Sequence, residues 1–126
     1  MAPLVNRQCV RYQVDWEVKT LNGQRVPETF LSDISAAGAM IEGPKPLALR
    51  NPLEFTYVRP GDDREKRRAG VVMWVRPLIH KPGRFQMGIK FFATDWSLDQ
   101  ELRQGAKFFL GSGDGQTRRE MNGCDE

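Results

Sequence analysis

Two arginines, Arg7 and Arg11, stand four positions apart near the start of the chain, in the stretch RQCVR. A guanidinium group is a planar fork that donates paired hydrogen bonds to a phosphate and can also stack on a base. In an extended backbone both side chains lie on one face, with their Cα atoms about 13 Å apart. Two such forks could hold a ligand with two phosphates. Two solvated surface arginines are the alternative explanation of this spacing alone.

The stretch SDISAAG, residues 32–38, offers complementary chemistry. The carboxylate of Asp33 can accept two parallel hydrogen bonds, and guanine, unlike adenine, presents N1–H and N2–H₂ as a matching pair of donors. A bidentate contact of this kind discriminates between bases by about 1–3 kcal/mol. Ser35 can bond a ligand or its own turn, and Gly38 permits positive φ or a close backbone approach. An ordinary Asx-type turn is the alternative here.

The elements that must position these residues begin with a long alternating segment, residues 9–19. A period of two predicts a half-buried strand, with Arg11 on the face opposite the apolar side chains. The following LNGQ is a hairpin signal, and the return strand is expected at about 25–32, where Pro27 indicates an edge or a bulge. SDISAAG then reads as a turn.

The rest of the chain continues as short strands and ends in a helix. Further strands are expected at residues 39–41, 53–58, 69–75 and 84–92, with a charged, solvated turn at 59–68. Helical spacing of apolar residues predicts a helix over 96–110. Ser97 and Gln100 form a candidate capping box, and Asp99 and Arg103 form a favourable pair one turn apart.

These elements predict an all-β fold with a C-terminal helix, a small antiparallel barrel partly covered by the helix. Three segments are expected. Residues 1–8 form a flexible N-terminal segment with the first motif arginine, 9–110 the barrel and helix, and 111–126 a flexible tail without an apolar face.

The sequence lacks the residues that several classes of function require. The chain has 126 residues and a single histidine, His80, so neither a Ser-His-Asp set nor a Cys/His metal cluster is expected. No apolar run is long enough to span a bilayer and no secretory signal is visible, which favours a cytoplasmic protein. The net charge of +3 suits an anionic ligand, but DNA or RNA binding is not expected.

An RxxxR before the first strand and a DxSxxG after the second resemble the PilZ domain, the bacterial receptor for cyclic di-GMP. The later stretches GVVMWVR and RFQMGIKF, with the Gly-x-x-Phe of Gly88–Phe91, are also similar, so the resemblance covers about residues 5–110. It implies a six-stranded antiparallel barrel with a C-terminal helix, in agreement with the strand pattern.

The resemblance also implies residue roles. Arg7 and Arg11 would grip the phosphates and a guanine Hoogsteen edge, while Asp33 and Ser35 hold the other guanine edge and Gly38 shapes the turn. Trp74 matches a position where some members place an aromatic near a guanine; a core tryptophan is the alternative. Asn6 stands where some members have another arginine, which favours one ligand per chain.

We therefore expect a stand-alone cyclic di-GMP receptor, not an enzyme, with no cofactor and no membrane insertion. Ligand would draw the N-terminal segment onto the barrel, and an unidentified downstream protein in motility, exopolysaccharide synthesis or virulence would read the changed surface. The alternatives are a PilZ-like protein adaptor that binds no nucleotide and a single-stranded nucleic-acid binder.

Overall fold

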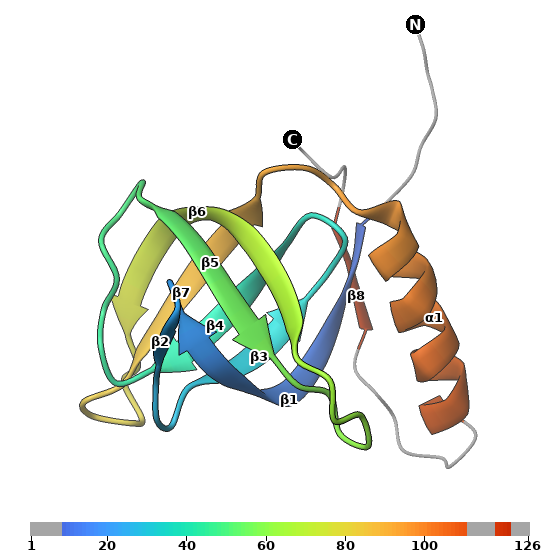
Figure 1. Cartoon of the computed structure of the whole chain (residues 1–126), viewed down its shortest axis with the longest axis horizontal. Coiled ribbons are helices and arrows are strands. Elements are labelled where there is room, and N and C mark those ends of the chain that lie inside the picture. Colours follow the sequence, from blue (N-terminus) through green and yellow to red (C-terminus); the bar gives the residue numbers. More distant parts are fainter. Residues whose placement is uncertain (1–8, 111–117, 122–126) are drawn as a thin grey trace, which may run out of the picture.

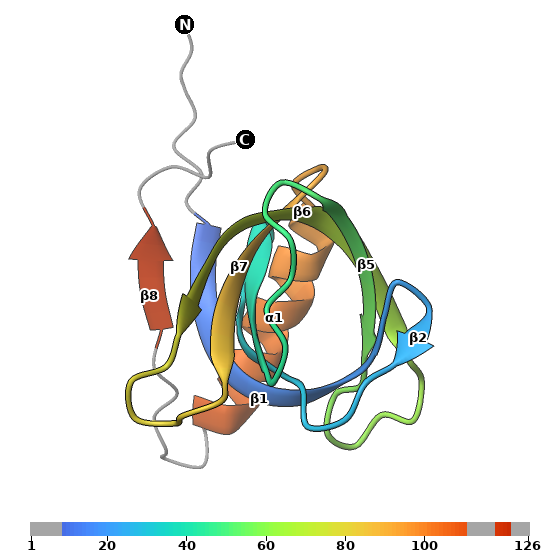
Figure 2. The same cartoon turned by 90° about the vertical axis from the view of Figure 1, so that its left-hand side faces the viewer.

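The computed structural model describes the backbone of residues 9–110 and 118–121 and the side chains of residues 10–104. The elements, in chain order, are β1 (Cys9–Leu21), β2 (Gln24–Arg25), β3 (Phe30–Ile34), β4 (Gly38–Gly43), β5 (Pro52–Tyr57), β6 (Lys66–Pro77), β7 (Phe85–Phe91), α1 (Trp96–Leu110) and β8 (Arg118–Met121). Figures 1 and 2 show a ring of strands with α1 across one end.

The strands form a closed antiparallel barrel. The hydrogen-bonded order is β1-β3-β4-β7-β6-β5, and β5 pairs again with β1, so six strands complete the ring. Closure leaves none of these six with an unpaired edge, which is the usual protection against edge-to-edge association. The predicted fold class is confirmed.

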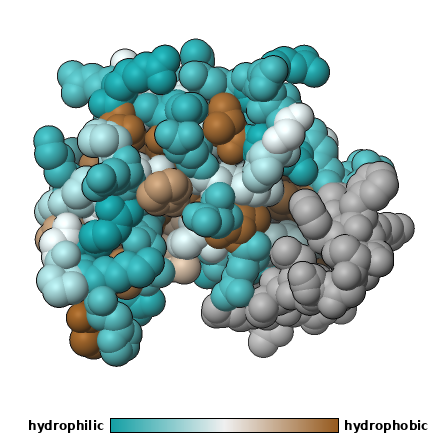
Figure 3. Space-filling view, turned by 90° about the horizontal axis from the view of Figure 1, so that it is seen from below, coloured by the Kyte–Doolittle hydropathy of each residue, from teal (hydrophilic) through white to brown (hydrophobic). Residues whose placement is uncertain are grey.

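Apolar side chains at every second position of the strands form the core, as the period of two predicts. Tyr12 and Val18 of β1 are buried, as are Phe55 and Tyr57 of the neighbouring strand β5, where Tyr57 pairs directly with Val18. Leu98 and Leu102 of α1 are also buried in this core, so the helix seals one end of the barrel. The outside, seen from below in Figure 3, is mostly hydrophilic, with small separate hydrophobic patches.

Some predicted boundaries were wrong. The return strand expected at 25–32 is broken into β2 and β3 around Pro27, which has no N–H to donate. The turn expected over 32–38 is shorter, because Ser32 to Ile34 belong to β3. The turn expected at 59–68 ends early, since β6 begins at Lys66 and pairs there with Tyr57.

The two ends of the helical region also differ from expectation. Asp95, not Ser97, caps α1: its Oδ1 accepts hydrogen bonds from the main-chain N–H groups of Ser97 and Leu98, at 3.1 and 3.2 Å. The predicted pair is confirmed, with Arg103 Nε 2.7 Å from Asp99 Oδ2. Within the segment 111–126, expected as a tail, Arg118–Met121 form β8 and pair with the start of β1.

Candidate functional site

Arg11 and Asp33 lie side by side on the outside of the barrel. Their neighbours Tyr12 and Ile34 pair across β1 and β3 and are buried in the core. Since side chains alternate along a strand, Arg11 is directed outward. Its Nη1 lies 3.6 Å from Asp33 Oδ2, and the Asp33 side chain is only 4% exposed, against 34% for Arg11. The two motifs are therefore joined by an ion pair. Arg7 lies outside the described residues, and the predicted separation of the two arginines stays a prediction.

The Ser35–Gly38 turn connects β3 to β4 and is stabilised from within. Ser35 Oγ accepts hydrogen bonds from the main-chain N–H groups of Ala37 and Gly38, at 3.1 and 3.3 Å, and Ser35 N–H donates to Gly38 O at 2.8 Å. Ser35 thus bonds its own turn, and its bond to a ligand stays a prediction. Its residue is only 3% exposed.

Gly38 is required for close approach rather than for positive φ. A Cβ at this position would collide with the main-chain carbonyl of Ile89 on β7. β4 pairs with β7 along its whole length, beginning with Gly38 opposite Lys90. A side chain here would push β4 away from β7 and displace the turn.

Trp74 is on the outer face of β6 and not in the core. The β6–β7 register shifts between Val72 and Trp74, so the intervening Met73 is an extra residue that reverses the alternation. Trp74 is half-buried, and its indole covers Gly88, where a Cβ would overlap the ring. The arginine two positions on, Arg76, places its guanidinium carbon 4.9 Å from the Trp74 ring centroid. This is a cation–π contact.

The strand register puts Asp33 and Trp74 in one row across the sheet. Asp33 pairs with Met40, Met40 with Gly88, and Gly88 with Trp74. Three strand spacings separate the ends of this row, about 14 Å. An extended ligand could therefore contact the carboxylate and the indole at once.

Sequence reasoning missed Arg76 and Gln86, which lie beside this row. Arg76 donates from Nε and Nη2 to Gln86 Oε1, at 3.2 and 2.9 Å, and this holds the guanidinium over Trp74. Arg76 shares the parity of Trp74, and Gln86 that of Gly88. The alternation of side chains along β6 and β7, which puts Arg76 on the face of Trp74, was the sequence signal that could have identified them.

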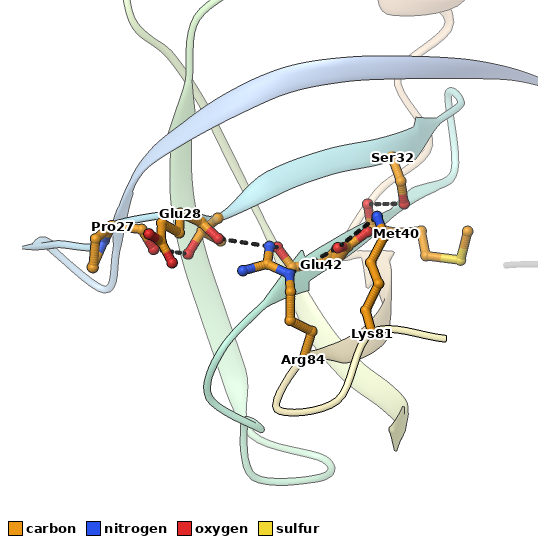
Figure 4. Close-up of polar contacts among 8 residues, drawn as sticks. Pro27, Glu28, Ser32, Met40, Glu42, Lys81 and Arg84 are labelled. Carbon is orange, nitrogen blue, oxygen red and sulfur yellow. Dashed lines mark hydrogen bonds and ion pairs between the residues drawn. The ribbon is translucent and has the colours of Figure 1, made fainter. Parts of the chain in front are cut away.

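A charged cluster lies around Glu42, two positions after Met40 on β4 and therefore on the same face (Figure 4). Glu42 Oε2 accepts from Arg84 Nε at 2.9 Å and from Lys81 Nζ at 3.4 Å, while Arg84 Nη2 donates to the carbonyl of Glu28 at 2.7 Å. Burial alone would raise the pKa of Glu42, but the hydrogen bonds from Arg84 and Lys81 outweigh it and hold the pKa below its ordinary value. The cluster fastens the β2–β3 connection to β4 and to the β6–β7 connection.

The described part of the chain has neither a metal-binding cluster nor a helix that could span a membrane. Residues 9–110 and 118–121 hold no group of three His, Cys, Asp or Glu side chains that could bind a metal ion. Over the same residues, no helix is long and apolar enough to cross a membrane.

The family model of the PilZ domain matches residues 6–108. The chain belongs to the PilZ domain family. PilZ domains are binding or adaptor domains, and the family is associated with cyclic di-GMP signalling. The RxxxR and DxSxxG residues discussed above fall inside the matched range.

A solved structure described as the Bacillus subtilis inhibitor of motility (MotI/DgrA) is similar in fold. Its sequence is 19% identical, the TM-score is 0.59, and the match covers 85% of this chain and 53% of that one. This chain thus spans about half the length of that protein, and the likeness concerns the fold alone. No curated protein sequence matches the chain significantly.

Proposed function

We propose that this PilZ domain is a receptor that binds cyclic di-GMP on the outer face of β1, β3, β4, β7 and β6. The observation that carries the proposal is the meeting of the two motifs, with Arg11 Nη1 3.6 Å from Asp33 Oδ2. A cation and a carboxylate on one face match a ligand that is both a phosphodiester and a guanine base.

Each site residue has a distinct role in this proposal. Arg7 and Arg11 hold the phosphates and a guanine Hoogsteen edge, and Asp33 accepts from guanine N1–H and N2–H₂. Ser35 and Gly38 keep the turn in place, and Ser35 can exchange a turn hydrogen bond for one to the ligand. Trp74, at the other end of the row, stacks on a base.

Ligand binding in this scheme requires a local rearrangement. The residues Asp33 and Ser35 are each only 3% exposed, and the Asp33 carboxylate is paired with Arg11. A ligand that binds both Arg11 and Asp33 must separate these two side chains and expose the Asp33 carboxylate. The surface around the start of β1 therefore differs between the free and bound states, and a downstream protein partner can respond to that difference.

We propose no enzymatic reaction and no nucleic-acid partner. The residues assigned here bind and orient a ligand, and the two charged motif side chains within the described residues, Arg11 and Asp33, are paired with each other. The regulated process, whether motility, exopolysaccharide synthesis or virulence, depends on which protein recognises the bound form.

A protein adaptor that binds no nucleotide is the second candidate. The burial of Asp33 and Ser35 and the turn hydrogen bonds of Ser35 favour it, because both side chains already have a purely structural use. In this case Arg11 and Asp33 would serve to join β1 to β3.

Calorimetric titration with cyclic di-GMP separates the two candidates, with cyclic di-AMP as the control ligand. Saturable binding of the guanine ligand alone is expected, at one ligand per chain. Asp33→Ala and Arg11→Ala should each weaken it by about 10- to 100-fold, equivalent to losing one bidentate contact.

Arg67→Ala is the matched control, because Arg67 is an exposed arginine near the start of β6, where it is paired with Glu54 of β5 and belongs neither to the two motifs nor to the row from Asp33 to Trp74. It should bind like the unmodified protein. Absence of binding at high cyclic di-GMP concentration, with the fold intact by circular dichroism, would favour the adaptor.

A further inference from the structure

The end of the barrel opposite α1 contains a cavity of about 350 Å³. It lies between the β1–β2 hairpin, the β2–β3 connection and the β4–β5 connection, which frame this end in Figure 2. One barrel end is thus sealed by Leu98 and Leu102, and the other is hollow. None of the cavity residues belongs to the proposed nucleotide site.

The inner part of the cavity is apolar. Leu21, Val26 and Leu47 line it and pack against the core, and Met87, which is 1% exposed, contributes from β7. A small barrel ordinarily fills its interior with side chains, and a mouth left open is a common place for a small ligand. The apolar lining selects for a hydrocarbon or aromatic group.

The charge of the lining residues is entirely positive. Arg25 and Lys45 both line the cavity and are exposed, and no lining residue is acidic. Neither cation forms an ion pair with any residue in the described part of the chain. Most other arginines and lysines of the barrel surface are paired, as Arg67 is with Glu54 and Lys81 with Glu42. Two unpaired cations beside an apolar hollow are complementary to an anion with an apolar body.

We propose that this barrel mouth binds an amphipathic carboxylate, a medium-chain fatty acid. The carboxylate lies between Arg25 and Lys45, and the chain extends inward over Val26, Leu47 and Met87. The cavity has the volume of about twelve water molecules in the liquid, which suits an acid of about eight carbons. The site is separate from the nucleotide face, so its occupancy does not depend on cyclic di-GMP.

The chemistry of this ligand can be tested on the full chain by two-dimensional NMR titration with octanoate, hexanoate, octanol and octylammonium. Octanoate is expected to bind more tightly than hexanoate by about 15-fold, since each buried methylene contributes about fourfold. Octanol should bind more weakly than octanoate, and octylammonium weakest of the four. Equal binding of octanoate and octylammonium would overturn the proposal, because the two cations would then have no role.

Substitutions of cavity residues test whether octanoate binds at this barrel mouth. Leu47→Trp fills the cavity and should abolish octanoate binding, and Lys45→Glu should weaken it at least about tenfold, as expected for replacing attraction by repulsion. Arg64→Glu makes the same change of charge in the exposed β5–β6 connection, away from the lining residues, and should leave binding unchanged.

The fold of each variant is checked by its thermal unfolding midpoint and by its cyclic di-GMP titration, which should both stay close to those of the unmodified protein. Octanoate binding that survives Leu47→Trp, or that falls equally in Arg64→Glu, would show that the acid binds elsewhere or only through net charge. Failure of cyclic di-GMP to bind the unmodified protein would bear on the nucleotide site alone, and the thermal unfolding midpoint would then serve as the check of each variant's fold.

Discussion

The main-chain N–H of Asp95 donates a 2.9 Å hydrogen bond to the carbonyl of Ala36, so the cap of α1 is fastened to the turn that follows Asp33 and Ser35. The neighbouring carbonyl, that of Ala37, accepts from Phe91 N–H, also at 2.9 Å. The Asp95 side chain extends the connection, because its Oδ2 lies 2.9 Å from Arg68 Nη1 on β6. Asp95 thus connects the Ser35–Gly38 turn to α1 and to strand β6.

Asp95→Ala should destabilise the protein by about 1–2 kcal/mol, because it removes both a helix cap and an ion pair. Asp95→Asn is the matched variant: asparagine caps as well as aspartate, so it should lose less than half as much. Urea unfolding monitored by circular dichroism measures both. Equal losses would mean that the contact with Arg68 matters and the cap does not.

The same connection predicts a response of α1 to ligand. If cyclic di-GMP binds Asp33 and Ser35, it stabilises the turn that carries the Ala36 carbonyl. The Asp95 N–H bonds this carbonyl, so the exchange rate of the Asp95 amide hydrogen should fall by about the factor by which the ligand stabilises the turn. Hydrogen exchange followed by NMR, with cyclic di-AMP as the control, tests this. Protection confined to β1 and β3 would show that the helix is not coupled to the site.

Trp74 and Gly88 should be energetically coupled. Gly88→Ala places a methyl group where the Trp74 indole lies, and overpacking of this kind costs about 1–3 kcal/mol. In a Trp74→Ala background the methyl group has room, and the cost should fall to nearly zero. A double-mutant cycle in urea therefore gives a coupling free energy close to the whole effect of Gly88→Ala. Additive losses would contradict the packing of the ring on Gly88.

Alternation of apolar residues predicted the barrel well, because it reports directly which side chains face the core. Tyr12, Val18, Phe55 and Tyr57 are buried as this period requires. It failed at Met73, where a bulge reverses the alternation while the residues remain uniformly apolar. No local signal in GVVMWVR distinguishes a core tryptophan from one on the outer face.

The helix start and the site geometry show two further limits. Asp95 and Ser97 are both good capping residues, and contacts with Arg68 and Ala36, distant in sequence, favour Asp95. The motif residues could be recognised from RxxxR and DxSxxG. Their mutual ion pair and the burial of Asp33 could not, because both depend on the register between β1 and β3.

The Glu42 cluster predicts how stability depends on pH. The pKa of Glu42 in the folded protein is lower than its ordinary value near 4.5, which the unfolded chain retains. The folded state therefore binds the proton less readily, and the contribution of Glu42 is present above about pH 4.5 and lost as the pH falls through the folded pKa. Glu42→Gln should destabilise the protein at pH 7 by about 1.5–3 kcal/mol, the range for a hydrogen bond to a charged group.

The loss in Glu42→Gln should shrink on acidification, because the unmodified protein then also has an uncharged side chain at this position. Urea unfolding at pH 7 and at pH 3 measures the difference. Glu54→Gln is the matched control: Glu54 is a half-exposed glutamate 3.5 Å from the exposed Arg67, a geometry worth little in water. It should show almost no loss at either pH. If the loss of unfolding free energy in Glu42→Gln is the same at both pH values, Glu42 stabilises the protein through the packing of its side chain beside Arg84 and not through its charge.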